Sequence, residues 1–214
     1  VAFCSSELCA QGRNSIFFSL GDDRFTSTDL SHWHHFEPGR IRISPELAME
    51  FAGSAAIPRG FEPSNATFNM FVGNDPKKWS SGRQAYASVI YKDLYPGIDL
   101  ICRQQGETRE TKSGGRFGVK SDFVIWPGAN PSRIRIRYSG AVSLRILPGD
   151  EGGRENLEIE TSAGKIREYI PAVFQEQSDG TRTKLRGSYV IYPDQSVGFD
   201  IPGRDPGLKT IIDP

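Results

Sequence analysis

Apolar and polar residues alternate over many short stretches of this chain. The clearest is 133–138 (RIRIRY), where Ile134, Ile136 and Tyr138 fall on one side of an extended strand. Turn residues separate successive stretches at intervals of about 8–12 residues, which is typical of β-sandwiches and barrels. No stretch keeps apolar residues at helical spacing over several turns. The pattern predicts an all-β, mainly antiparallel and sandwich-like protein.

The predicted strands lie at 16–20, 40–43, 47–51, 68–72, 85–91, 98–103, 120–125, 133–138, 142–147, 157–161, 165–169, 172–176, 183–192 and 197–201. The third of them is ambiguous, because Ser44 and Pro45 before it also resemble the start of a helix. The segment alternates, however, with Leu47, Met49 and Phe51 on one face. We therefore expect a strand there.

A weak internal repeat supports that choice. Residues 47–55 (LAMEFAGSA) resemble 133–141 (RIRIRYSGA), since both alternate and then reach an aromatic residue, a small residue and Gly. Gly at that point lets the backbone turn where a side chain would not fit. Either two related β lobes or chance similarity explains the likeness. We expect a single domain over 1–214, with two packed lobes, 1–75 and 76–214, as the alternative.

Composition excludes two classes of partner. Lys and Arg (26) balance Asp and Glu (26), whereas a nucleic-acid binder normally carries a basic excess. No apolar run approaches the roughly 20 residues of a membrane-spanning helix. Gly (23) and Pro (14) are frequent, as expected for many turns. We expect no nucleic-acid binding and no membrane-spanning segment.

The chain has three cysteines, in two settings. Cys4 and Cys9 are close enough in sequence to bridge a short loop in an oxidising compartment, and whether they do so is left open. Cys102 shares a strand face with Ile98 and Leu100, which predicts a buried, unreactive thiol.

All three histidines fall in one segment, His32-Trp33-His34-His35. From a strand, His32 and His34 would point the same way and, with Glu37, have the donor types that bind zinc or copper. Nothing elsewhere in the sequence supplies a further ligand, so a surface loop is the simpler interpretation. Whether His32, His34 and His35 bind a metal is left open, and we expect no metal or other cofactor.

Four aromatic residues at or near turns are the candidate ligand-binding residues: Trp79, Tyr91, Tyr95 and Trp126. Tyr95 and Trp126 each begin an aromatic-Pro-Gly turn. Aromatic rings in such places can stack on sugars, or they can pack over the turn as part of the core. Both interpretations remain open at this point.

Catalytic signatures are weak. There is no G-x-S-x-G motif for a nucleophile. Asp93 and Asp99 flank the 95–97 turn, and a glycosidase needs two carboxyl groups about 5–10 Å apart. An Asp beside such a turn more often accepts backbone N–H bonds, however, and the same applies to Asp75 before Pro76. We expect structural aspartates and no catalytic residues.

Two charged ladders are the last candidate site. Arg133, Arg135 and Arg137 fall on one strand face, and Glu158 and Glu160 fall on a later strand. An anion or polysaccharide site is one interpretation. A solvated sheet face, with ion pairs if the two strands are neighbours, is the simpler one.

Five segments, taken in order, resemble a known family. They are 69–79 (NMFVGNDPKKW), 89–100 (VIYKDLYPGIDL), 122–132 (DFVIWPGANPS), 165–175 (KIREYIPAVFQ) and 211–214 (IIDP). Together they resemble the N-terminal domain of unknown function of bacterial SBBP-repeat (β-propeller) proteins, over roughly residues 40–214. The family has no assigned activity, and the resemblance implies a secreted or cell-surface multidomain protein.

These observations give a first expectation of function. The chain begins at Val1 without an apolar leader, so we expect a piece of a longer polypeptide. We expect a non-catalytic structural or adhesive module that docks against following β-propeller repeats or other β domains. A carbohydrate-binding module is the first alternative, and an extracellular hydrolase is the second.

Overall fold

The computed structural model describes residues 2–4, 17–20, 23–27, 34–71, 74–104, 119–148, 155–169 and 171–214. The strands are β1 (Ala2–Cys4), β2 (Phe17–Ser19), β3 (Phe25–Ser27), β4 (His35–Glu37), β5 (Arg40–Arg42), β6 (Ala48–Phe51), β7 (Pro58–Met70), β8 (Ser80–Tyr95), β9 (Ile98–Gln104), β10 (Val119–Ile125), β11 (Ile136–Ser139), β12 (Ala141–Pro148), β13 (Glu155–Thr161), β14 (Gly164–Glu168), β15 (Ala172–Glu176), β16 (Arg182–Leu185), β17 (Ser188–Ile191), β18 (Val197–Asp200) and β19 (Lys209–Asp213). The helices of this part of the chain are two short 3-10 helices, η1 (Pro76–Lys78) and η2 (Pro131–Arg133). The prediction of an all-β fold is confirmed. Within the same residues, no helix is long and apolar enough to cross a membrane.

Alternation located most strands, and its errors have physical causes. β15 has the predicted bounds, and the ambiguous third segment forms a strand, β6. The predicted strand 183–192 is two strands, because the chain turns at Gly187, where a Cβ atom would lie 2.4 Å from Val173 Cγ2. The pattern does not predict β1, β3, β4 or β19. Three of these strands have only 3 residues, over which an alternation is hard to recognise, although β2 and β5 of the same length are predicted.

One large antiparallel sheet joins strands from the whole length of the chain. Its order is β16-β15-β19-β10-β9-β8-β2-β3-β4-β5-β6-β11-β18-β17, with β7 paired to β8 and β1 paired to β7. The consecutive strands β16 and β17 lie at opposite ends of this order. The last strand of the structure, β19, pairs with β10, with Ile212 opposite Phe123. Many neighbours are consecutive strands, but β15-β19, β19-β10, β8-β2, β6-β11, β11-β18 and β1-β7 join strands that are far apart in sequence.

The large sheet folds over so that two of its parts face each other across a core. We call β8, β9, β10, β19 and β15 the first layer, and β4, β5, β6, β11, β18 and β17 the second layer. Phe51 of β6 contacts Tyr91 of β8 edge to face, and Phe123 of β10 contacts Phe199 of β18. These rings are buried. The fold is therefore sandwich-like, as the alternation predicts.

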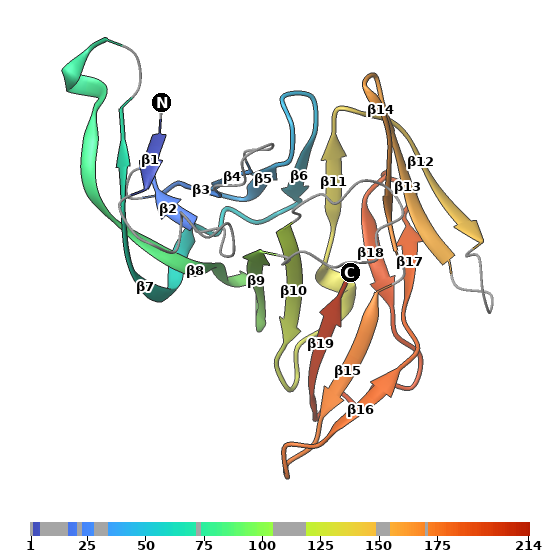
Figure 1. The fold of residues 1–214 in the computed structure, drawn as a ribbon. Coiled ribbons are helices and arrows are strands. Elements are labelled where there is room, and N and C mark those ends of the chain that lie inside the picture. Colours follow the sequence, from blue (N-terminus) through green and yellow to red (C-terminus); the bar gives the residue numbers. More distant parts are fainter. Residues whose placement is uncertain are drawn as a thin grey trace.

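A small second sheet, β12-β13-β14, packs beside the second layer (Figure 1). Leu157 and Ile159 of β13 point into the common core. On the opposite face, Glu158 Oε1 lies 2.9 Å from Lys165 Nζ, and Arg167 lies beside the same carboxylate. The acidic ladder of β13 is therefore matched by the basic residues of β14.

The arginine ladder, Arg133, Arg135 and Arg137, points outward, as predicted. It does not lie beside the acidic ladder of β13. The neighbours of β11 are β6 and β18. Arg137 pairs instead with Asp194 at 3.2 Å, and the Arg135 guanidinium stacks 3.3 Å from the centroid of the Tyr192 ring. Arg133 is exposed. The ladder forms a solvated face with local partners.

The two segments that resemble each other are neighbours in the sheet. β6 and β11 pair antiparallel, with Phe51 opposite Ile136. The Gly that follows the aromatic residue in each segment, Gly53 or Gly140, has a positive φ, 77° and 95° respectively. The two strands thus share a local two-fold arrangement. The β7–β8 hairpin crosses the proposed boundary between residues 75 and 76, and the division into two lobes stays a prediction.

β7 and β8 extend away from the two layers as a long hairpin, which we call the arm (Figure 1). β7 begins at Pro58, earlier than predicted, and its pairing with β8 shifts register between Pro63 and Thr67. Gly60 lies against the Tyr86 ring, which a Cβ atom would meet at 2.5 Å. The prolines and irregular register in the earlier part of β7 disfavour pairing with a further strand there, whereas β1 pairs with residues 68–70 at its end.

Candidate functional site

The four aromatic residues predicted to bind a ligand lie in different environments. Trp79 and Trp126 are 44% and 40% exposed, whereas Tyr91 and Tyr95 are buried. A ligand that stacks needs access to the ring. Of these four residues, the two tryptophans are accessible and the two tyrosines are not.

Tyr91 joins the two layers. Its hydroxyl lies 2.8 Å from the Arg40 carbonyl oxygen and 3.0 Å from the Glu37 carbonyl oxygen. Burial raises the pKa of Tyr91 well above its usual value, so the phenol keeps its proton to donate. The residue therefore fastens β8 to the turn between β4 and β5.

Tyr95 makes a second fastening between the layers. Its hydroxyl donates to the Arg135 carbonyl oxygen at 2.8 Å and accepts from the Arg135 N–H at 3.2 Å. Burial raises the pKa of Tyr95 as well. The end of β8 is thereby tied to the segment that enters β11.

Three Pro-Gly turns meet at the end of the first layer. The Trp126 N–H donates to the Gly97 carbonyl oxygen at 3.0 Å, and the Gly128 N–H donates to the Pro206 carbonyl oxygen at 2.8 Å. Gly97 and Gly128 have positive φ, 72° and 81°, as such turns require. The third turn, at residues 205–207, has the same Pro-Gly sequence, and this signal could have identified it from the sequence alone. We call residues 95–97, 126–128 and 205–207 the turn cluster.

Trp126 is held over a buried carboxylate. Its Nε1–H donates to Asp99 Oδ2 at 2.8 Å, and Lys92 Nζ lies 2.6 Å from the same oxygen. The Asp93 N–H donates to Asp99 Oδ1 at 2.8 Å. Partial burial alone would raise the pKa of Asp99, but these hydrogen bonds outweigh it and lower the pKa. Asp99 is a structural acceptor, as predicted for an aspartate beside this turn.

Two lysines approach the indole of Trp126. Lys92 Nζ and Lys209 Nζ each lie 5.3 Å from the ring centroid, within the range of cation–π attraction. They belong to β8 and β19, which lie on opposite sides of β10 in the sheet. Sequence reasoning missed both, because only the strand pairing brings them to Trp126.

Trp79, the second exposed tryptophan among the described residues, lies at the far end of the arm. Trp79 and Phe71, which is 36% exposed, meet edge to face with their centroids 5.5 Å apart. In the sequence between these two residues, Asp75 Oδ1 accepts from the Lys77 N–H at 3.1 Å and caps η1, as predicted. We call Phe71, Trp79 and η1 the arm tip.

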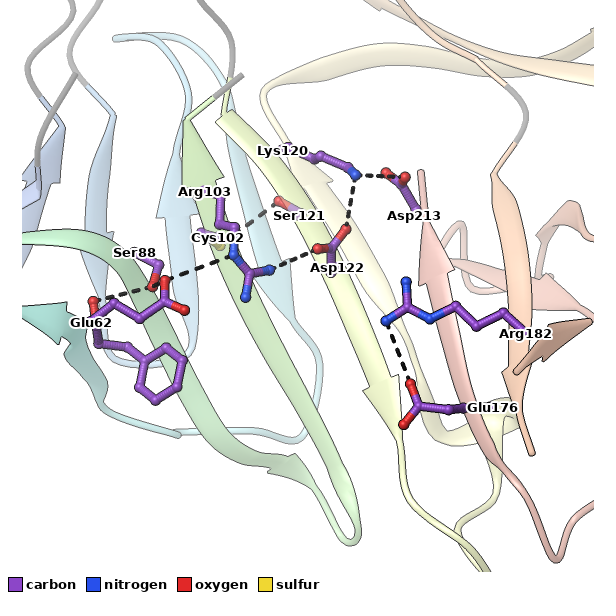
Figure 2. Close-up of polar contacts among 11 residues, drawn as sticks. Glu62, Ser88, Cys102, Arg103, Lys120, Ser121, Asp122, Glu176, Arg182 and Asp213 are labelled. Carbon is purple, nitrogen blue, oxygen red and sulfur yellow. Dashed lines mark hydrogen bonds and ion pairs between the residues drawn. The ribbon is translucent and has the colours of Figure 1, made fainter. Parts of the chain in front are cut away.

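A row of ionic side chains crosses the outer face of the first layer (Figure 2). Arg103 Nη1 lies 2.9 Å from Asp122 Oδ2, and Lys120 Nζ lies 2.7 Å from Asp213 Oδ2. Glu62 of β7 approaches Arg103 Nε at 4.0 Å. Every carboxylate of this row therefore has a cationic neighbour.

Asp122 and Asp213, which both contact Lys120, can be compared with the paired carboxylates that a hydrolase needs. Burial raises the pKa of Asp122, even though Lys120 and Arg103 lie nearby. Asp122 Oδ1 has no hydrogen-bond partner, and Lys120 Nζ is 3.6 Å away. Because Lys120 lies between the two carboxylates, the pair has the character of a structural ion-pair row.

The remaining candidates are histidines and cysteines. His34 Nδ1 lies 3.5 Å from the Ser27 hydroxyl, and burial lowers the pKa of His35. Among the described residues, no three His, Cys, Asp or Glu side chains group as metal ligands. His32 and Cys9 lie outside those residues, so the metal and disulfide questions stay open.

Cys102 is buried and free, as predicted. Burial raises the pKa of its thiol to about 12. A thiol that is protonated and enclosed reacts slowly. Cys102 is therefore a core residue.

A family model matches residues 11–214, and its description is domain of unknown function (DUF7948). The matched segment contains the arm, the turn cluster and the ionic row. No curated protein and no solved structure matches the chain. The family description assigns no reaction, ligand or partner.

Proposed function

This chain belongs to that family of domains of unknown function, and we propose that it is a non-catalytic docking module of a secreted or cell-surface protein. Its partners would be other β domains of the same polypeptide, such as the propeller repeats that the sequence resemblance implies. The engagement of Asp99, Asp122 and Asp213 by cationic side chains supports a non-catalytic role.

The observation that carries this proposal is the arm tip. An aromatic pair, Phe71 and Trp79, lies exposed at the end of a projecting hairpin. Large aromatic side chains dominate the binding energy of protein interfaces. Phe61 of the arm and Ile57, which directly precedes β7, are also exposed, at 41% and 47%. A partner that covers the arm would bury these side chains together.

Hydrogen exchange on the full-length polypeptide tests the proposal. Backbone amides of 71–80 should exchange at least about tenfold more slowly there than in the isolated chain, because docking removes them from solvent. The segment 139–148, which contains the exposed Val142, is the internal control and should exchange equally in both. Equal exchange at the arm tip in the two samples would contradict docking through this surface.

A second candidate function is carbohydrate binding at the turn cluster. The specific observation is the exposed indole of Trp126 beside Lys92 and Lys209, which combines an aromatic ring with donors for hydroxyl or carboxylate groups. Tryptophan fluorescence measured against neutral and acidic polysaccharides tests it. Trp126→Ala should abolish any response that Trp79→Ala preserves, and the absence of a response to every polysaccharide would eliminate this function.

A further inference from the structure

One carboxyl group lies on the core-facing side of the small sheet. Glu168, the last residue of β14, is opposite Leu157 of β13. The preceding residue on the same face, Ile166, is opposite Ile159. Strand alternation therefore places this acid in a row of apolar side chains that points toward the second layer.

The partners of this carboxyl group are phenols. The Tyr138 hydroxyl of β11 donates to Glu168 Oε2 at 2.9 Å, and the Tyr189 hydroxyl of β17 lies near enough to this carboxyl group to influence its pKa. Among the described residues, no Lys, Arg or His forms an ion pair with Glu168. Burying an ionised carboxylate without a cation is costly.

Counting hydroxyl protons indicates which group must donate. The Tyr189 hydroxyl donates to the Tyr169 carbonyl oxygen at 3.0 Å, and a phenol has one proton. Toward Glu168, the Tyr189 oxygen can therefore act as an acceptor but not as a donor. A protonated carboxyl group satisfies both phenols, since it accepts from Tyr138 and donates to Tyr189. An ionised one cannot donate.

We propose that Glu168 is a proton-operated latch between the small sheet and the large sheet. When protonated, it joins β14 to Tyr138 of β11 and Tyr189 of β17. When ionised, it leaves an uncompensated charge in this seam and weakens the attachment of β14. The latch is independent of the docking function proposed above.

The direction of the pH response follows from burial. Burial raises the pKa of Glu168 above its usual 4.5, and the hydrogen bond from Tyr138 together with the nearby Tyr189 hydroxyl offsets only part of that rise. Burial also raises the pKa of both tyrosines, and the other carboxylate that acts on Tyr189 is Asp213. While the latch is closed, the pKa of Glu168 is therefore above 4.5. The stabilisation that protonated Glu168 gives the seam is fully present below pH 4.5 and is lost as pH rises through the raised pKa.

Hydrogen exchange of β14 amides between about pH 4 and about pH 8, corrected for intrinsic rates, tests the latch. The opening constant of the wild-type seam should rise up to about tenfold per pH unit above 4.5 and then level off at the raised pKa. Glu168→Gln should remove this slope, because the amide accepts from one phenol and donates to the other without ionising.

Glu160→Gln is the matched control. Glu160 lies on the outer face of β13 and accepts from the Ser143 hydroxyl at 2.7 Å, so its variant should keep the wild-type slope. A flat wild-type profile, or the same slope in Glu168→Gln, would overturn the proposal. If Glu168→Gln does not fold, carboxyl ¹³C NMR of the wild-type protein decides: Glu168 must titrate above 4.5, and titration at or below that value refutes the latch.

Discussion

Replacing Tyr95 by Phe removes one hydroxyl from the seam between the two layers. That hydroxyl donates to the Arg135 carbonyl oxygen and accepts from the Arg135 N–H. The carbonyl oxygen keeps a second partner, the Ala52 N–H at 2.9 Å, so the variant leaves mainly the N–H without an acceptor. An unsatisfied buried donor costs about 1–3 kcal/mol. We expect Tyr95→Phe to lower the free energy of unfolding by about 2 kcal/mol.

Thermal unfolding followed by circular dichroism measures this change. For a domain of this size, about 2 kcal/mol corresponds to a decrease in Tm of about 4–8 °C. Tyr169→Phe is the control, since Tyr169 is 68% exposed and its variant should stay within about 0.5 kcal/mol of wild type. If Tyr95→Phe unfolds at the same temperature as this control, the hydroxyl does not contribute to holding the two layers together.

Three further predictions concern the turns and the core. Gly140→Ala should destabilise the fold by about 3 kcal/mol or more, because its Cβ would lie 1.7 Å from the Glu46 carbonyl oxygen. Gly53→Ala has open space around its Cβ and should destabilise the fold by about 1 kcal/mol. Urea unfolding measures both changes. The pKa of Asp99 is lowered below 3.8, so its contribution to stability is present above that value and disappears as pH falls through the lowered one. Asp99→Asn should therefore reduce the loss of stability on acidification, which denaturation measured at about pH 2–5 will show. A rise in thiol pKa from 9.0 to about 12 at Cys102 should slow its alkylation at least about 1,000-fold relative to a free cysteine. Rapid labelling of Cys102 itself in the native protein, located by peptide mass spectrometry, would contradict its burial.

The sequence by itself determined most of the strands and, within them, the direction of the side chains. Alternation is a property of neighbouring residues, so Ile134, Ile136 and Tyr138 point inward wherever their strand lies. Turn chemistry is equally local, which is why Asp75 and Asp99 accept the backbone N–H bonds expected of them.

Only the tertiary structure decided which strands meet and therefore what each side chain contacts. Tyr95 and Trp126 begin the same kind of turn, yet Tyr95 points between the layers and Trp126 lies outside them. Their local sequences do not contain this difference, because it depends on Arg135 and Lys209, which come from elsewhere in the chain. Pairing between distant strands follows from the way the whole sheet closes over its core, and a local pattern with a period of two residues carries no record of that closure.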